Sequence, residues 1–166
     1  RSVAWAWMKG SSLCGQLGLA GKQRGDRGAL RRRLSAQAVK LLLDTNAALF
    51  MWMDRSRFSP TGLTLLESTD HTVVFSQVST GEICLKYQNG KLPLPELPPA
   101  YLRKRIRQSE LTYEPIADDA LFRTVELPPH HHDPFDRLLI ASAQILGIPI
   151  LTADESFRRY PVEVLW

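Results

Sequence analysis

The stretch that most constrains the fold of this chain spans residues 39–50, where a short apolar run ends in a carboxylate. The run is Leu41–Leu43, and Asp44 follows it directly. Consecutive apolar residues between polar ends are typical of a strand buried on both faces of a parallel sheet. A helical apolar pattern begins after Asp44, and Thr45 or Asn46 can cap that helix. Asp44 is therefore expected at the carboxyl end of a central strand, where active sites of open α/β sheets collect.

Strand-like and helix-like segments alternate through the rest of the chain. The β-branched run at 72–76 predicts a second strand, and later strands are expected near 111–116, 148–151 and 162–165. Between them the spacing predicts helices, among them one over 79–90 that Ser79 or Thr80 caps and one over 136–146 that ends at Gly147. This alternation predicts an α/β fold, with a mostly parallel sheet between two layers of helices.

Basic charge is concentrated in the first 38 residues. They contain eight Lys or Arg against one acidic residue, Asp26, whereas residues 39–166 contain 13 basic against 16 acidic residues. We interpret residues 1–38 as a basic, disordered leader or a non-native extension. A basic arm that contacts nucleic acid is the alternative for this segment. Because the body is mildly acidic, its charge does not argue for nucleic-acid binding.

Length and cysteine content limit the class of protein. The body is long enough for one domain with a substantial core, and no apolar stretch reaches the roughly 18 residues of a membrane span. The cysteines, Cys14 and Cys84, are far apart and form no C-x-x-C pair, so neither a disulfide framework nor a zinc site is indicated. We expect a cytoplasmic protein in a reducing compartment.

Four acidic residues are predicted at strand ends or helix starts. Glu82 is expected in the first turn of the helix after the second strand, Asp136 opens a later helix, and Asp154 follows the strand that ends at Leu151. With Asp44 they are expected at one edge of the sheet. Such a cluster of like charges is unfavourable unless a cation neutralises it. Oxygen ligands suit Mg²⁺ or Mn²⁺, which can polarise a phosphoryl oxygen and activate water for phosphodiester hydrolysis.

Four sequence segments together resemble the PIN domain, and more closely the VapC toxins of type II toxin–antitoxin systems. These segments are L-L-L-D-T-N, S-T-G-E-I-C-L-K-Y-Q-N-G-K-L-P-L-P, H-H-H-D-P-F-D-R-L-L-I-A-S-A and L-T-A-D-E-S-F. The resemblance covers residues 39–166 and implies a PIN domain there, with a three-layer α/β/α sandwich. The leader departs from the family pattern, since family members begin within a few residues of the first strand.

The resemblance also implies a function and a set of site residues. It implies Mg²⁺- or Mn²⁺-dependent endoribonuclease cleavage of RNA, a homodimer, and inhibition by a VapB-like antitoxin that lies over the active-site groove. The family's catalytic, metal-binding acids map onto Asp44, Glu82, Asp136 and Asp154. Supporting residues are expected at Thr45 or Asn46 and at Thr152.

Each of these residues also has a purely structural interpretation. Glu82 can form an ion pair with Lys86 on the next turn, although Lys86 can instead contact the RNA backbone. Arg137 can orient a carboxylate or contact phosphate. Asp133 and Asp154 can be helix caps. The triplet His130–His132 is expected as a solvated loop, because the side chains of consecutive residues diverge and do not easily share one ion.

Three other functions compete with the nuclease. A catalytically silent PIN-like module could pair only with an antitoxin or RNA, but the complete set of four acids argues against it. A haloacid-dehalogenase-like phosphatase would have a second Asp two residues after Asp44, where this chain has Asn46. A receiver domain would place a Lys after the late strand, which leads here to Asp154.

Overall fold

The computed structural model describes residues 38–166. The predicted leader, residues 1–38, lies outside the described residues except for its last one. No helix within the described part of the chain is long and apolar enough to cross a membrane.

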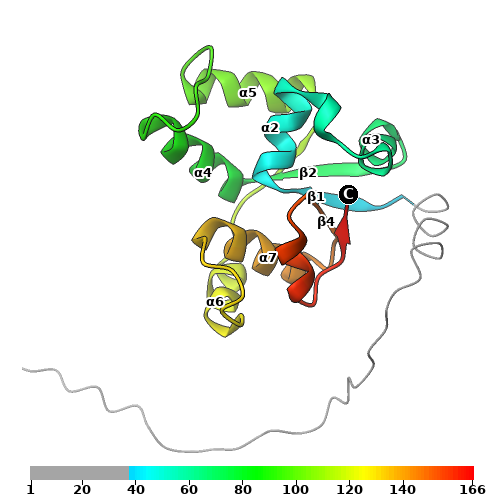
Figure 1. Cartoon of the computed structure of the whole chain (residues 1–166), viewed down its shortest axis with the longest axis vertical. Helices are drawn as coiled ribbons and strands as arrows, with labels where there is room; N and C mark the ends of the chain where they lie inside the picture. The colour runs from blue at the N-terminus through cyan, green and yellow to red at the C-terminus, as the bar shows by residue number, and fades with distance from the viewer. Residues whose placement is uncertain (1–37) are drawn as a thin grey trace, which may run out of the picture.

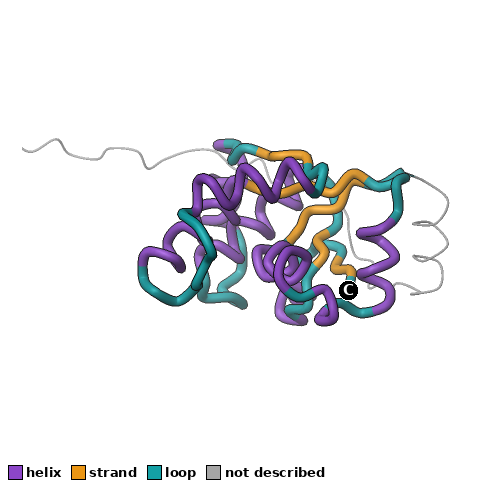
Figure 2. The backbone as a smooth tube through the Cα atoms, turned by 90° about the horizontal axis from the view of Figure 1, so that it is seen from above, coloured by secondary structure: helices purple, strands orange, loops and turns teal. Residues whose placement is uncertain are grey.

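Five parallel strands form one sheet in the order β3-β2-β1-β4-β5. The strands are β1 Lys40–Leu43, β2 Thr72–Ser76, β3 Thr112–Glu114, β4 Ile150–Leu151 and β5 Val164–Leu165. Viewed from above, they follow one another through the body of the molecule with helices on both sides (Figure 2). The sheet that the sequence predicted is confirmed, and its strand pairs within residues 38–166 are all parallel.

Within the described residues, six α-helices cover the sheet. They are α2 Thr45–Met53, α3 Pro60–Glu67, α4 Gln77–Gln88, α5 Pro98–Gln108, α6 Asp118–Glu126 and α7 Pro134–Leu146, with 3-10 turns η1 Arg55–Arg57 and η2 Glu155–Arg159. Helices α2, α4 and α5 lie on one side of β1 and β2, and α6 and α7 on the other (Figure 1). The predicted three-layer α/β/α sandwich is therefore confirmed.

The strand β1 lies at the centre of both hydrophobic layers, as its sequence predicted. Leu41 and Leu43 pack into the core beneath α2 and α5, whereas Leu42 faces the core formed with α7. All three leucines are completely buried. Burying such a side chain is worth about 1.5–3 kcal/mol, so this strand anchors both layers.

The capping residues determine where the helices begin and end, and the sequence predicted some of these boundaries wrongly. The helix α4 begins at Gln77, and the Ser76 hydroxyl caps it by accepting the Val78 N–H at 3.1 Å. The predicted start at Ser79 or Thr80 is therefore wrong, and Glu82 lies in the second turn of α4 rather than the first. The predicted end of α7 at Gly147 is confirmed, because Gly147 adopts the left-handed conformation (φ +64°) that favours glycine.

The neighbours of β1 define where a site can form. The strand β1 pairs with β2 on one side and with β4 on the other. Asp44 and Thr152 directly follow these two paired strands, β1 and β4. Strand order reverses at this point, and such switch points form a crevice at the carboxyl ends of the strands.

Candidate metal centre

Asp44 lies at the carboxyl end of β1 with a carboxylate that is only partly satisfied. The residue is 2% exposed, and its Oδ2 accepts a hydrogen bond from the Thr152 hydroxyl at 2.8 Å. The other oxygen, Oδ1, is buried without a partner. Burial raises the pKa of Asp44 to about 6, although the Thr152 hydroxyl opposes this rise. Asp44 is the residue that precedes α2, and its side chain makes no capping hydrogen bond there.

Glu82 reaches the site from α4 and shows the same pattern. Its side chain is 5% exposed, and Oε1 forms an ion pair with Lys86 Nζ at 2.5 Å, one turn along the helix. The second oxygen, Oε2, is buried and unpartnered. The predicted ion pair between Glu82 and Lys86 is therefore present, and it leaves one carboxylate oxygen of Glu82 unused.

Asp136 is the carboxyl group most affected by its neighbours. It lies in the first turn of α7 with 17% of its side chain exposed. Its pKa is raised to about 8, chiefly by burial and then by the negative charges of Asp44, Asp133, Glu82 and Asp154, in that order of effect. The four acids that the sequence singled out are thus close enough to interact electrostatically.

Asp154 differs from the other three acids because its charge is stabilised locally. Its Oδ1 accepts the Ser156 N–H at 2.8 Å and caps η2, so its predicted role as a cap is confirmed. Burial acts to raise its pKa, but the Ser156 amide and the His131 ring outweigh burial, and the pKa of Asp154 is lowered. The Thr152 hydroxyl accepts the Asp154 N–H at 3.0 Å and so links Asp154 to Asp44.

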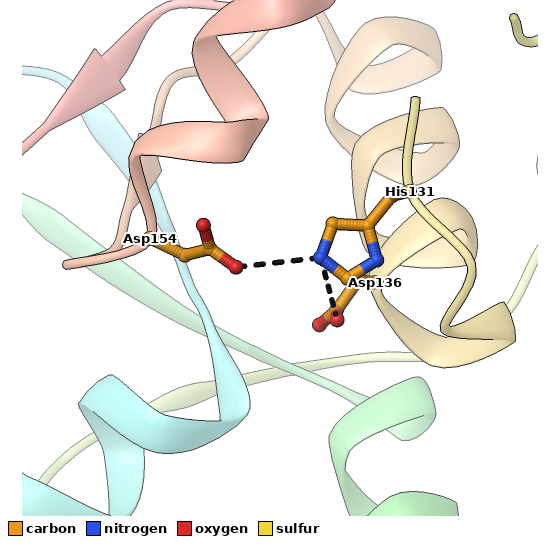
Figure 3. Close-up of side chains that lie close together, drawn as sticks. All are labelled: His131, Asp136 and Asp154. Carbon is orange, nitrogen blue, oxygen red and sulfur yellow. Dashed lines mark hydrogen bonds and ion pairs between the residues drawn. The ribbon is translucent and has the colours of Figure 1, made fainter. Parts of the chain in front are cut away.

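His131 is the site residue that the sequence interpretation missed. Its Nε2 lies 3.2 Å from Asp136 Oδ2 and 3.3 Å from Asp154 Oδ2, and its side chain is 17% exposed (Figure 3). The expectation of a solvated loop is wrong for this member of His130–His132. The side chains of consecutive residues diverge, but this divergence still allows one of the three histidines to enter the site.

Among the remaining predicted site residues, Thr45 and Asp133 bond to groups other than the site acids, and Asn46 is exposed. The Thr45 hydroxyl donates to Ser79 Oγ at 2.9 Å and ties α2 to α4, rather than contacting a site acid. Asn46 is exposed, and its side chain has no hydrogen bond among residues 38–166. The Asp133 side chain caps α7 by accepting the Phe135 N–H at 2.8 Å.

Arg137 has a structural role that neither predicted alternative anticipated. Its guanidinium donates to the backbone carbonyls of Pro128, Thr124 and Leu127 at 2.8–3.0 Å. These bonds fasten the loop before α7 to the end of α6. Because these donors bind carbonyl oxygens, Arg137 orients this loop and not a carboxylate.

The donor set fits a hard divalent cation. Asp44 Oδ1 and Glu82 Oε2 are both buried without a hydrogen-bond partner, and a buried unpaired carboxylate oxygen is costly. The ligand atoms of His131, Asp136 and Asp154 lie within 4.8 Å of one another. Carboxylate oxygens are the donors that Mg²⁺ and Mn²⁺ prefer, and an ion among them would relieve the repulsion that raises the pKa of Asp136.

Comparison with known proteins gives one family and several similar structures. Residues 41–163 match the family profile of the PIN domain. No curated protein sequence matches the chain significantly.

Three solved structures illustrate the likeness of the fold. VapBC2 from Rickettsia felis, bound to a DNA fragment from its promoter, is 19% identical, with a TM-score of 0.59 over 77% of this chain and 99% of that one. DNA-bound VapBC from Salmonella typhimurium is 20% identical, with a TM-score of 0.58 over 76% and 97%. FitAcB from Neisseria gonorrhoeae is 20% identical, with a TM-score of 0.50 over 76% and 96%.

Proposed function

Because this chain belongs to the PIN domain family, we propose that it is a Mg²⁺- or Mn²⁺-dependent endoribonuclease that acts as the toxin of a toxin–antitoxin pair. The observation that carries the proposal is the pair of buried, unpartnered oxygens on Asp44 and Glu82, beside an Asp136 whose pKa is raised to about 8. Such groups destabilise a fold unless they serve a bound cation.

We assign the cation to the four acids that the sequence singled out. Asp44, Glu82 and Asp136 offer oxygens from three different elements, and Asp154 adds a fourth carboxylate beside His131. Thr152 supports the set by holding Asp44 and the backbone of Asp154 together. When bound, a divalent ion supplies charge neutralisation at the phosphate and activation of water for attack on the phosphodiester.

The chain's own residues prepare the site for that chemistry. The Thr152 hydroxyl donates to Asp44 Oδ2 and thereby leaves Oδ1 free as a ligand. The Lys86 ammonium neutralises Oε1 of Glu82 and leaves Oε2 free in the same way. Lys86 is 34% exposed, so it can also approach the phosphate backbone of RNA. Each acid is therefore oriented by one partner and keeps one oxygen for the ion.

The toxin role and the partners are inferred from the similar structures. VapBC2 and VapBC are complexes solved with DNA, and their folds match most of this chain. We propose a VapB-like antitoxin, a homodimeric toxin and a cytoplasmic location for this protein. We further propose that residues 39–166 are the working domain and that the leader takes no part in the reaction.

A cleavage assay tests the proposed function. The purified protein is incubated with RNA and Mg²⁺ or Mn²⁺, with and without chelator, and Asp44→Asn is compared with the wild type. Asp70→Asn is the matched control, because Asp70 is an exposed carboxylate whose side chain has no bond among the described residues. We expect cleavage only with metal, loss of at least about 100-fold for Asp44→Asn, and full activity for Asp70→Asn.

Two results would contradict the proposal. Cleavage that persists in chelator or survives Asp44→Asn would exclude the metal–carboxylate mechanism. A wild-type protein that binds an antitoxin but cleaves no RNA with either metal would favour the catalytically silent binding module instead. Circular dichroism of each variant checks that loss of activity is not loss of fold.

A further inference from the structure

The contacts of both ring nitrogens of His131 bear on the cation site. Nε2 lies between the carboxylates of Asp136 and Asp154, at 3.2 and 3.3 Å. The close-up shows the ring entering from the loop before α7, with Asp154 on the opposite side of the site (Figure 3). Two roles fit such a nitrogen: a ligand that offers its lone pair to the cation, or a donor whose N–H holds the two carboxylates.

The other ring nitrogen distinguishes the two roles. The Asp133 backbone N–H donates to His131 Nδ1 at 3.2 Å, so the Nδ1 lone pair is already used as an acceptor. A neutral imidazole carries its single proton on the nitrogen that does not accept, and here that nitrogen is Nε2. Histidines that bind metals show the reverse arrangement, in which the second nitrogen donates its N–H to a carboxylate or carbonyl.

Several contacts fix the loop that carries His131 and the position of its ring. The His131 backbone N–H donates to the Tyr160 hydroxyl at 2.8 Å, and Tyr160 in turn donates to the Pro128 carbonyl at 3.1 Å. The imidazole packs edge-on against Phe157, with ring centroids 5.9 Å apart. Since the Asp133 side chain caps α7, its backbone N–H is fixed relative to the helix that carries Asp136.

We propose that His131 is a positioning residue that holds Asp136 and Asp154 through its Nε2–H and does not ligate the cation. The proposal rests on the metal centre of the proposed function and deepens it, because it states which atoms the cation meets. With His131 acting as a donor, the centre stays an all-oxygen site. All-oxygen sites suit Mg²⁺ and Mn²⁺, whereas an added imidazole favours softer ions such as Zn²⁺.

The first measurement asks whether a histidine nitrogen binds the ion. Mn²⁺ is added to the full-length wild-type protein, and electron spin echo spectra are recorded for coupling to ¹⁴N. We expect bound Mn²⁺ without the coupling of a directly ligated imidazole nitrogen. A strong ¹⁴N coupling that disappears in His131→Ala but persists in His132→Ala would overturn the proposal. Binding of Mn²⁺ with an all-oxygen spectrum supports it.

The second measurement asks whether an N–H at the Nε2 position is enough. A glutamine amide reaches about as far as Nε2, whereas an asparagine amide reaches only as far as Nδ1. We therefore expect His131→Gln to stay within about 3-fold of the wild-type Mn²⁺ affinity, and His131→Ala and His131→Asn to bind about 10-fold more weakly. His132→Gln is the matched control, because His132 is exposed and makes no bond among the described residues.

The outcomes separate this proposal from the proposed function. If the wild type binds no Mn²⁺, the metal centre itself is wrong and this inference falls with it. If Mn²⁺ binds and RNA is cleaved but His131→Gln is as impaired as His131→Ala, only the donor role is overturned. Thermal unfolding in chelator identifies any variant that has lost its fold. Tyr160→Phe removes the hydroxyl that binds the His131 backbone and so tests the placement of this loop without altering the imidazole.

Discussion

The buried acids make a specific prediction about how stability depends on pH, and Asp136→Asn tests it. In chelator, the wild-type protein is expected to lose stability as pH rises from about 6 to 8.5, whereas Asp136→Asn is not. The pKa of Asp136 is raised from 3.8 to about 8, chiefly by burial. Between pH 3.8 and about 8 the unfolded chain has ionised Asp136 while the folded chain still holds the proton, so rising pH favours the unfolded state up to about pH 8.

The magnitude follows from the shift and the exposure of the group. A rise of roughly four pKa units corresponds to at most about 6 kcal/mol, lost between about pH 4 and pH 8, and about half of this loss falls above pH 6. The side chain is 17% exposed, and screening by water reduces the part above pH 6 to about 1–2 kcal/mol. For a domain of this size, that corresponds to a fall in Tm of about 5 °C. The pKa of Asp44 is raised only to about 6, so the stability lost through this residue is lost mainly below pH 6 and adds little above it.

Thermal unfolding followed by circular dichroism measures this effect at a series of pH values in chelator. Wild type and Asp136→Asn should have similar Tm near pH 5, and the variant should be the more stable near pH 8.5. Excess Mg²⁺ should restore the wild type at high pH, because the ion replaces the proton, and should have little effect on the variant. Repeating the pair in a His131→Gln background removes that imidazole from the comparison.

Parallel pH profiles for the two proteins would refute this reasoning. They would mean that Asp136 ionises near its usual pKa in the folded chain and that the neighbouring carboxylates do not repel it. If the Tm of the wild type falls with pH but does not respond to Mg²⁺, the acids do repel one another, but Mg²⁺ is not the ion that neutralises them.

Three further predictions concern other parts of the molecule. Leu43→Ala should lower the free energy of unfolding by about 3 kcal/mol in urea denaturation, since Leu43 is fully buried in the central strand, and a loss below about 1 kcal/mol would contradict that placement. Thr152→Val should weaken Mn²⁺ binding about 5- to 10-fold in calorimetry because Asp44 loses its donor, whereas Thr152→Ser, which keeps the hydroxyl, should not. Gly147→Ala should lower the stability of the fold by about 1 kcal/mol because of its positive φ, with Gly81→Ala, at a helical position, as the comparison.

The sheet and its carboxyl edge were predictable because they depend on short-range patterns. Leu41–Leu43 could hardly form anything other than a doubly buried strand, and strand–helix alternation then implied a parallel sheet. Helix ends were less predictable where two caps competed. Ser76 and Ser79 are both capping residues in sequence, and only the pairing of β2 in the sheet determines that Ser76 is the one that begins α4.

The orientation of side chains in loops could not be predicted from the sequence. Whether His130, His131 or His132 faces the acids depends on the Tyr160 hydroxyl, which comes from a distant segment and binds the His131 backbone. Arg137 shows the same limit, because its partners are backbone carbonyls, which leave no trace in a residue pattern. Long-range polar contacts of this kind are specified by the tertiary structure alone.

The two unpartnered oxygens and the raised pKa of Asp136 have a common physical meaning. A fold selected for stability alone would not bury Asp44 and Glu82 with one free oxygen each, since every such group costs roughly 1–3 kcal/mol. Each acid nevertheless has one donor, Thr152 or Lys86, that fixes its orientation without satisfying its second oxygen. A carboxylate with one bonded and one unbonded oxygen is held rigidly and still has an oxygen available for a cation. The energetic cost of the unbonded oxygens is then confined to this site. Because a divalent ion binding the folded chain would offset that cost, stability and metal binding in this protein should be linked through the same few atoms.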